Sequence, residues 1–177
     1  MPLCKYGTLL ATGKGDADRA EIIYLQALQI DSRHAETLCA YALLLEQERQ
    51  DASGAEKLYR RALDACPDHV PSMYQYGMML DDNGKYDAAE MLYRRVLQVQ
   101  PKHCDCYCRY GLLLDRHGHT HSAQDMFEAA LSIDSSHADA LCAYGDFLSR
   151  VRGDAAAAEK HYKRALLVDP DHVDAQC

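Results

Sequence analysis

The sequence predicts an all-α repeat protein, and three observations support this prediction. A Tyr followed by a small residue recurs every 34 or 35 residues along the 177-residue chain. Each interval contains two stretches whose apolar residues fall at i, i+3, i+4 and i+7, which is typical of amphipathic helices. Turn-forming segments such as GKGD, DNGK and VRGD separate the two stretches. A helical hairpin of this size cannot bury its own apolar faces, so neighbouring hairpins are expected to stack.

The first helix of each interval is predicted from the Tyr and the small residue. The five pairs are Tyr6/Gly7, Tyr41/Ala42, Tyr76/Gly77, Tyr110/Gly111 and Tyr144/Gly145. Around the second pair, Leu38, Tyr41, Ala42 and Leu45 lie on one stripe of a helix, and this stripe is expected to be buried. Small residues allow helices to cross at close range, where a larger side chain would hold them apart.

The second helix of each interval is predicted from an alanine and from an aromatic residue four positions later. The aromatic residues are Tyr24, Tyr59, Tyr93, Phe127 and Tyr162. Short polar side chains favour the N-cap, and the candidates here are Asp16, Asp87 and Asp154. Proline stops a helix, and Pro67, Pro101 and Pro170 stand where the second helices are expected to end. A histidine closes each interval and is interpreted as a loop or cap residue: His34, His69, His103, His137 and His172.

These helices divide the chain into five repeats within one continuous domain. The expected boundaries are 1–34, 35–69, 70–103, 104–137 and 138–172, and residues 173–177 begin a sixth unit. The first helix of repeat 1 is short, and neither end carries a polar capping helix. Solenoids need such a helix to cover their last apolar face. We therefore expect either a longer parent protein or self-association through the uncapped ends.

Composition excludes several classes of function. A net charge of −8 argues against binding to nucleic acid, which depends on Lys and Arg contacts to phosphates. No apolar run is long enough to cross a membrane, and the N-terminal segment lacks the pattern of a secretory signal, so a cytoplasmic or nuclear protein is expected. The eight cysteines are then expected to be reduced thiols.

These residues together resemble the tetratricopeptide repeat (TPR) family. In the third repeat, the family's small, aromatic and proline positions are occupied by Gly77, Ala89, Tyr93, Val96 and Pro101. The extra residue in the inner turn of repeats 1, 2 and 5 is similar to the related half-a-TPR repeats. The resemblance implies a right-handed superhelical solenoid whose first helices line a concave groove.

The groove that the resemblance implies has an apolar floor and mostly acidic rims. The position three residues before the small residue is expected to lie on this floor. In successive repeats it is occupied by Cys4, Cys39, Tyr74, Cys108, Cys142 and Cys177. Small thiols that simply fit a semi-buried helix face are the main interpretation of this position. Metal binding and redox sensing remain open alternatives, whereas a disulfide ladder is excluded by the expected spacing of the helices. The full set of expected groove residues is Cys39, Leu43, Glu46, Tyr74, Met78, Asp81, Asp82, Cys108, Leu112, Asp115, Cys142 and Asp146.

Three other patterns contain residue types that are common in sites. Two of them are candidate metal-ligand clusters: His117, His119 and His121, and His103, Cys104, Cys106 and Cys108. They lie at opposite ends of one helix, so they cannot form one metal centre, and no metal or other cofactor is expected. The basic pairs Arg60/Arg61, Arg94/Arg95 and Lys163/Arg164 are interpreted as a solvated outer face. TPR domains that clamp a terminal carboxylate use Lys and Asn, and the matching positions here hold other residues.

The sequence therefore predicts a protein-interaction scaffold and not an enzyme, because it shows no phosphate loop, nucleophile elbow or HExxH motif. The expected partner is a protein segment, namely a basic amphipathic peptide or helix held in the concave groove. The alternative is a structural spacer, stacked or self-associating, within a larger multiprotein complex. In that case the ends and the convex face make the contacts.

Overall fold

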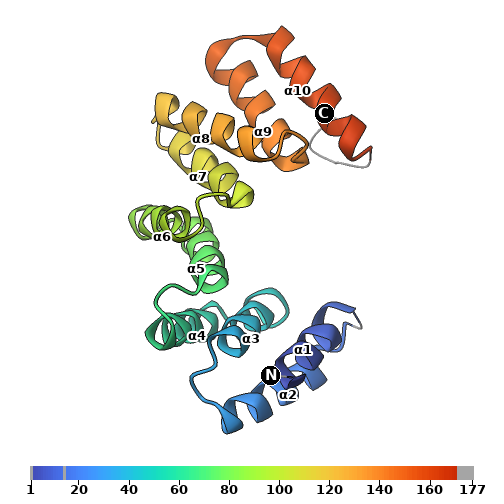
Figure 1. Ribbon diagram of the computed structural model, residues 1–177, viewed down its shortest axis with the longest axis vertical. Helices are drawn as coiled ribbons and strands as arrows, with labels where there is room; N and C mark the ends of the chain where they lie inside the picture. The colour runs from blue at the N-terminus through green and yellow to red at the C-terminus, as the bar shows by residue number, and fades with distance from the viewer. Residues whose placement is uncertain (1, 14, 171–177) are drawn as a thin grey trace. The chain divides into compact units, whose positions relative to one another are not determined.

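The computed structural model describes residues 2–13 and 15–170 and is built from paired helices (Figure 1). Within these residues there are ten α-helices and two short π-helical turns, and no strand. The sixth-unit segment 173–177 and His172 lie outside the described residues. The chain forms two compact units, Met1–Asn83 and Gly84–Cys177. The all-α repeat architecture predicted from the sequence is thus confirmed.

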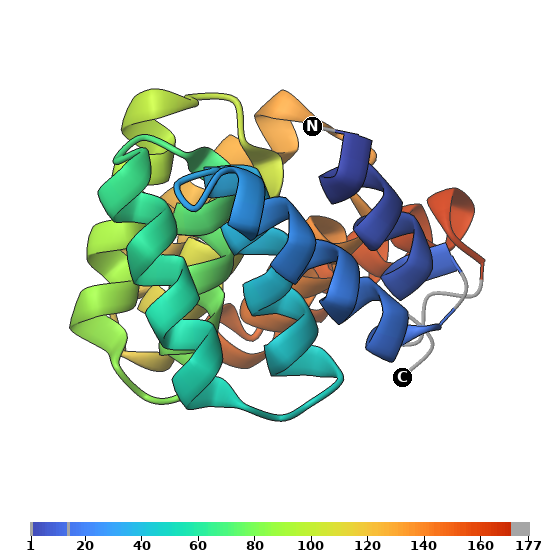
Figure 2. The same cartoon turned by 90° about the horizontal axis from the view of Figure 1, so that it is seen from below.

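The first unit contains two complete helical pairs and a fifth helix. Its elements are α1 (Pro2–Thr8), η1 (Leu9–Gly13), α2 (Ala17–Ile30), α3 (Ala35–Gln47), α4 (Ala52–Ala65) and α5 (Val70–Asp82). We call α1, α3, α5, α7 and α9 the first helices, and the even-numbered helices the second helices. α1 packs on α2, and α3 packs on α4, while the first helices α1, α3 and α5 contact one another in sequence. In Figure 2, the α3–α4 pair again lies side by side.

The second unit repeats this arrangement. Its elements are α6 (Tyr86–Val99), α7 (Cys104–Arg116), α8 (Thr120–Ile133), α9 (Ala138–Phe147), η2 (Leu148–Arg152) and α10 (Ala155–Val168). α7 packs on α8, and α9 packs on α10. Second helices stop at Ala65, Val99 and Val168, each two residues before the proline that was expected to end it.

Close helix crossings within the pairs depend on glycine. A Cβ built on Gly111 would lie 2.8 Å from Cε1 of Phe127, and a Cβ on Gly7 would lie 2.6 Å from Cε1 of Tyr24. Gly145 meets the Tyr162 ring in the same way, at 2.7 Å. Real side chains do not tolerate such distances, so the aromatic ring of the second helix requires glycine at these three positions.

A recurring joint links each second helix to the first helix that follows it. The ring of Tyr59 stacks on that of Tyr76 with centroids 5.7 Å apart, and the Tyr76 hydroxyl donates to Glu56 Oε1 at 3.2 Å. The ring pairs Tyr24–Tyr41, Tyr93–Tyr110 and Phe127–Tyr144 are equivalent. In each case the first-helix tyrosine donates to a glutamate, in the order Glu21, Glu90 and Glu128. The tyrosine before the small residue thus serves to join successive pairs.

The basic pairs on the second helices take part in the same joint. Arg60 Nε donates to the Tyr76 hydroxyl at 3.0 Å, and Arg94 Nε donates to the Tyr110 hydroxyl at 2.9 Å. Arg61 donates to the carbonyl of Ser32, and Arg164 to the carbonyl of Ser135, each in the loop of the preceding pair. Arg60, Arg61 and Arg94 are exposed, as expected, whereas Arg164 is half-buried, and all four also hold neighbouring pairs together.

The extra residue of repeats 1, 2 and 5 is absorbed in the turn between paired helices. In these turns the N–H of the N-cap aspartate donates to the carbonyl six residues earlier, as from Asp154 to Leu148 at 3.1 Å. In repeat 4 the equivalent bond runs from His119 to Leu114, five residues earlier, at 2.9 Å. The longer turn is π-helical in η1 and η2, which is how one added residue fits at a helix end.

One predicted helix cap is wrong. Asp16 and Asp154 are N-caps, but α6 begins after Lys85, and Asp87 lies inside its first turn. The N-cap is always the residue four before the buried alanine of the second helix, which places it at Lys85 because this turn is one residue shorter. By the same rule Asp51 is an N-cap that the sequence did not single out, and its side chain accepts from Gly54 N at 2.9 Å.

The repeated histidines are caps of the first helices. In His34, His69, His103 and His137, the ring accepts a hydrogen bond from the backbone N–H three residues later. This accounts for one N–H that would otherwise lack a partner at each helix start. No helix in residues 2–13 or 15–170 has the length and apolar character needed to cross a membrane.

Candidate peptide-binding face

The candidate site is the side of the first helices that does not pack against their paired second helices. In the first unit it carries Cys39, Leu43, Glu46, Tyr74, Met78, Asp81 and Asp82, and in the second unit Cys108, Leu112, Asp115, Cys142 and Asp146. We call these the inner-face residues.

The inner-face cysteines are packing residues. Cys39, Cys108 and Cys142 are 4%, 4% and 3% exposed, so they are covered by their neighbours and do not form an open floor. Burial raises the pKa of Cys39 to about 11 and that of Cys108 to about 12. All cysteines of the described residues are free thiols. Their burial supports the interpretation that small thiols fit between adjacent first helices.

Apolar side chains of intermediate exposure supply the contact area of the face. Leu43, Tyr74 and Met78 in the first unit and Leu112 in the second are half-buried. Leu43 lines a cavity of about 260 Å³ between the η1 region and α3, together with Thr8, Gln47 and Glu48. Half-buried apolar groups beside a cavity can bury further area when a partner covers them.

Three acidic inner-face residues form hydrogen bonds or ion pairs within the chain, which the sequence did not indicate. Glu46 accepts a hydrogen bond from the Tyr59 hydroxyl at 3.0 Å, and Asp146 accepts one from the Tyr162 hydroxyl at 2.6 Å. Asp115 forms an ion pair with Arg150 and keeps only 6% of its side chain exposed. Burial raises the pKa of Glu46, which the nearby charge of Asp82 raises further.

The two remaining acidic residues of the face differ from each other. Asp81 is buried at 3% exposure, whereas Asp82 is exposed at the end of α5. The negative charge that solvent can reach on this face is therefore concentrated at Asp82 and Asp146.

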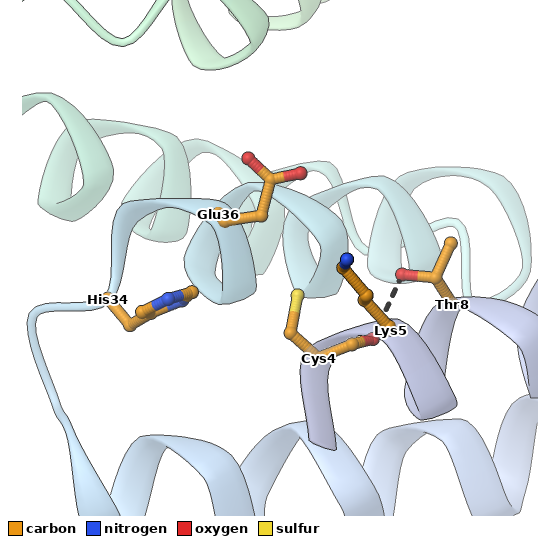
Figure 3. Close-up of a pocket in the computed structure, with 5 residues that line it drawn as sticks. All are labelled: Cys4, Lys5, Thr8, His34 and Glu36. Atoms are coloured by element: carbon orange, nitrogen blue, oxygen red, sulfur yellow. Dashed lines mark hydrogen bonds between the residues drawn. The ribbon is translucent and has the colours of Figure 1, made fainter. Parts of the chain in front are cut away.

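A second cavity lies at the start of the first unit, and the sequence did not single it out as a site. Its volume is about 410 Å³, and it is lined by Cys4, Lys5, Thr8, His34 and Glu36 (Figure 3). Cys4 and Thr8 occupy the same helical positions in α1 as Cys39 and Leu43 occupy in α3. The signal that was missed is His34, a cap residue whose ring also borders a cavity.

The candidate metal ligands do not converge. Among the residues that the structure describes, no group of three or more His, Cys, Asp or Glu side chains is arranged to hold a metal ion. His117 packs edge-on against the ring of Tyr86, with centroids 4.2 Å apart, and His119 is the N-cap residue of α8. Cys106 is buried and donates to the carbonyl of Tyr93 at 3.6 Å.

The comparisons with known proteins agree on the fold. Residues 69–136 match the family model described as tetratricopeptide repeat. A solved structure of PilF from Pseudomonas aeruginosa superimposes with a TM-score of 0.87 at 19% identity, covering 98% of this chain and 78% of that one. YrrB, described as a TPR protein with an unusual peptide-binding site, gives a TM-score of 0.72 at 22% identity, with 99% of this chain and 89% of that chain covered.

A third similar structure is MamA, with a TM-score of 0.74 at 22% identity over 89% of this chain and 91% of that one. A search of curated protein sequences found no match. At these identities the similar structures establish the fold alone.

Proposed function

Because this chain is a tetratricopeptide-repeat protein, we propose that it is a non-catalytic interaction module that binds a basic amphipathic peptide or helix on its inner face. The observation that carries the proposal is the set of half-buried apolar side chains Leu43, Met78 and Leu112, beside which Tyr74 is also half-buried. The cavity beside Leu43 gives an apolar anchor of the partner a place to insert.

The charge of the face supports a partner with Lys or Arg beside its apolar anchors. Asp82 and Asp146 are exposed, and the whole chain carries a net charge of −8. Exposed charges of this kind act mainly on the rate and selectivity of association and are screened by salt. Since Glu46 and Asp115 already have partners in the chain, the apolar contacts are expected to supply most of the affinity.

The test is a titration with a fluorescent amphipathic helical peptide of Leu and Lys, compared with a scrambled peptide of the same composition. We expect micromolar-range binding of the amphipathic peptide that weakens with salt. The double substitution Met78→Lys plus Leu112→Lys should abolish it. The matched control is Met91→Lys, at a methionine that is 72% exposed on the second helix α6. Unchanged affinity in the folded double variant would rule out the inner face as the binding site.

A second candidate is the structural spacer, and a separate observation favours it. The start of the first unit exposes Tyr6, Leu9 and Ile22 at 40%, 55% and 53%. Tyr6 and Ile22 also line a cavity of about 140 Å³. A surface of this kind suits docking of another helical pair or another copy of the chain.

Sedimentation velocity over a range of protein concentrations separates the two candidates. A spacer that self-associates through this surface gives a sedimentation coefficient that rises with concentration and returns to the monomer value in Ile22→Lys. The control is Leu167→Lys, at an exposed leucine of α10. A monomer at all concentrations would favour the peptide-binding module.

A further inference from the structure

The cap histidines of two first helices each hold a carboxylate from the preceding first helix. His69 Nε2 lies 3.0 Å from Glu36 Oε2, and His137 Nε2 lies 3.0 Å from Asp105 Oδ1. In both rings Nδ1 accepts from a backbone N–H, of Ser72 and Ala140 respectively. The proton of the neutral ring must therefore be on Nε2, which donates to the carboxylate. In two places within the chain, a cap histidine thus donates a hydrogen bond to a carboxylate.

His34 has the same cap geometry without the carboxylate. Its Nδ1 accepts from Thr37 N at 3.2 Å, so its Nε2 also carries a hydrogen that is available for donation. Glu36 and Asp105 each lie two positions after the cap histidine of their own helix, and each bonds the cap histidine of the first helix that follows. The position that would serve His34 in this way is residue 1, which is not acidic. Within residues 2–13 and 15–170, Nε2 of His34 makes no hydrogen bond.

The cavity in front of His34 adds a second donor, and this one is cationic. Lys5 lines the same cavity of about 410 Å³ and is exposed to solvent. The hydroxyl of Thr8 already donates a hydrogen bond to the carbonyl of Cys4 at 3.1 Å, so its hydrogen is not available to a ligand. In Figure 3 the ring of His34 points toward the side of the cavity that carries Cys4 and Lys5.

The remaining charged group of the cavity does not oppose an anion directly. Glu36 is the residue bound by His69, and in Figure 3 its carboxylate points away from Cys4. One oxygen of this carboxylate thus already accepts a hydrogen bond from the next cap histidine. The volume of the cavity falls within the range of small-ligand pockets and is large enough for a carboxylate with its neighbouring carbon atoms.

We infer that this cavity is a carboxylate-binding pocket in which Nε2 of His34 and the ammonium group of Lys5 hold one carboxylate of a bound peptide. The carboxylate is either the C-terminus or an Asp or Glu side chain of that peptide. The biological meaning of the pocket rests on the proposed function, but its chemistry can be tested without any partner. The pocket uses a cap histidine and a lysine of α1, so it differs in residues from the terminal-carboxylate clamp discussed above.

The experiment is a nuclear magnetic resonance titration of the ¹⁵N-labelled protein with three small probes. N-acetylglycine presents a terminal carboxylate, N-acetylglutamate α-amide presents a side-chain carboxylate, and N-acetylglycinamide is neutral. We expect both acids to shift the His34 Nε2 signal and the Lys5 amide in a saturable way, and the neutral probe to leave them unchanged. The acid with the higher affinity identifies the source of the carboxylate.

Two variants assign the binding to the named groups. His34→Asn keeps an N-cap side chain, because asparagine caps helices well, but removes Nε2 and should weaken acid binding by about tenfold. Lys5→Gln should weaken it severalfold. The matched control is His137→Asn, whose ring is already engaged by Asp105, and this variant should bind the acids as the parent does.

Unchanged binding in a folded His34→Asn or Lys5→Gln variant, or equal shifts with the neutral probe, would overturn the inference. Such a result would not bear on the proposed peptide binding by the apolar inner face, since Met78 and Leu112 do not line this cavity. Conversely, loss of peptide binding in the Lys variants of those two residues, with the acid titration intact, would concern the proposed function alone.

Discussion

At the scale of single residues, the absence of a side chain decides how closely two helices approach. Gly111 and Gly145 in the second unit lie so close to an aromatic ring that a Cβ on either would be less than 3 Å from a ring carbon. Phe127, against which Gly111 lies, is fully buried, so it has no free space into which to move. The contact therefore resists any larger residue more strongly than helix propensity alone would suggest.

We expect Gly111→Leu to lower the free energy of unfolding by about 1 to 3 kcal/mol, because the new side chain overpacks the contact between α7 and α8. Urea denaturation followed by circular dichroism measures this change. Lys102→Ala, in an exposed linker, serves as the control and should have almost no effect. Equal stability of the two variants would show that the assigned crossing is wrong.

A second residue-scale effect concerns the turn of repeat 2. Gln50 has φ = 53° and is the one non-glycine residue with positive φ among the described residues. The equivalent position is glycine in the other long turns, at Gly15 and Gly153. A left-handed conformation costs an L-residue about 1 kcal/mol, so Gln50→Gly is expected to raise stability by up to this amount. A lower midpoint of thermal unfolding than in the parent chain would refute it.

At the scale of helices, the joint between successive pairs separates into a stacking part and a hydrogen-bonding part. Tyr110 supplies both, because its ring lies against Tyr93 and its hydroxyl bonds Glu90 and Arg94. Tyr110→Phe should therefore cost about 1 kcal/mol, the usual net contribution of a hydrogen bond, and Tyr110→Ala about 3 kcal/mol or more. Tyr107→Phe on the same helix is the control, and thermal denaturation of the four proteins tests the order.

The cap of α7 predicts a pH dependence of stability. Burial lowers the pKa of His103 below its ordinary value, although the charge of Asp105 offsets part of the effect. As the pH falls, the unfolded chain binds the proton first, at a pKa of about 6.5. The stabilising contribution of the neutral cap is therefore fully present above this pH and is lost as the pH falls through the lower pKa of the folded state.

Urea titrations of the parent chain and of His103→Asn between pH 7.5 and 5.5 test this. Asparagine keeps the cap without titrating, so the variant should lose less stability over this range, by at most about 1.4 kcal/mol per pH unit. His121→Asn, at an exposed histidine, should leave the slope unchanged. Identical slopes for the parent chain and His103→Asn would contradict the assignment.

Much of this element-scale picture follows from sequence spacing. The helix-ending prolines and the cap histidines are local signals, and within the described residues they are found where they were predicted. Of the apolar stripe predicted in the second repeat, Leu38 and Ala42 are buried and Tyr41 and Leu45 are half-buried. Asp87 was misplaced because the turn before α6 is one residue shorter, so similarity of the turn sequence was a poorer guide than distance from the buried Ala89. The joint around Tyr76 was not predicted, because it needs the relative rotation of two helices that no single-helix pattern contains.

The candidate site was predictable only in part for the same reason. Helical spacing identified Leu43, Met78 and Leu112 as side chains that pairing does not use, but it could not indicate that Arg150 would neutralise Asp115. That ion pair joins residues 35 positions apart. Likewise, the cavity around His34 depends on the packing of α1 against α3, which involves residues distant in the chain.

At the scale of the whole molecule, the cysteines form a built-in reporter of unfolding. Cys66 is exposed, Cys104 is of intermediate exposure with its pKa raised to about 11 by burial, and the remaining described cysteines are buried. In a Cys177→Ser variant at pH 8, one thiol is expected to react rapidly with Ellman's reagent, and the other six only as the chain opens. Cys66→Ser in the same background should remove the fast phase. Several fast thiols in the native protein would contradict the burial described here.

The joint between Tyr59 and Tyr76 has a consequence for how such a chain can grow. Residues 35–69 carry both halves of the joint: Tyr41, which binds the glutamate of the preceding pair, and Glu56 with Tyr59, which receive the tyrosine of the following pair. The segment also ends on a cap histidine that serves the next helix. A tandem duplication of these 35 residues would therefore present matching surfaces at the one new junction, between the two copies. Descent by unequal crossing-over could lengthen the array in single steps, without first having to evolve a new interface.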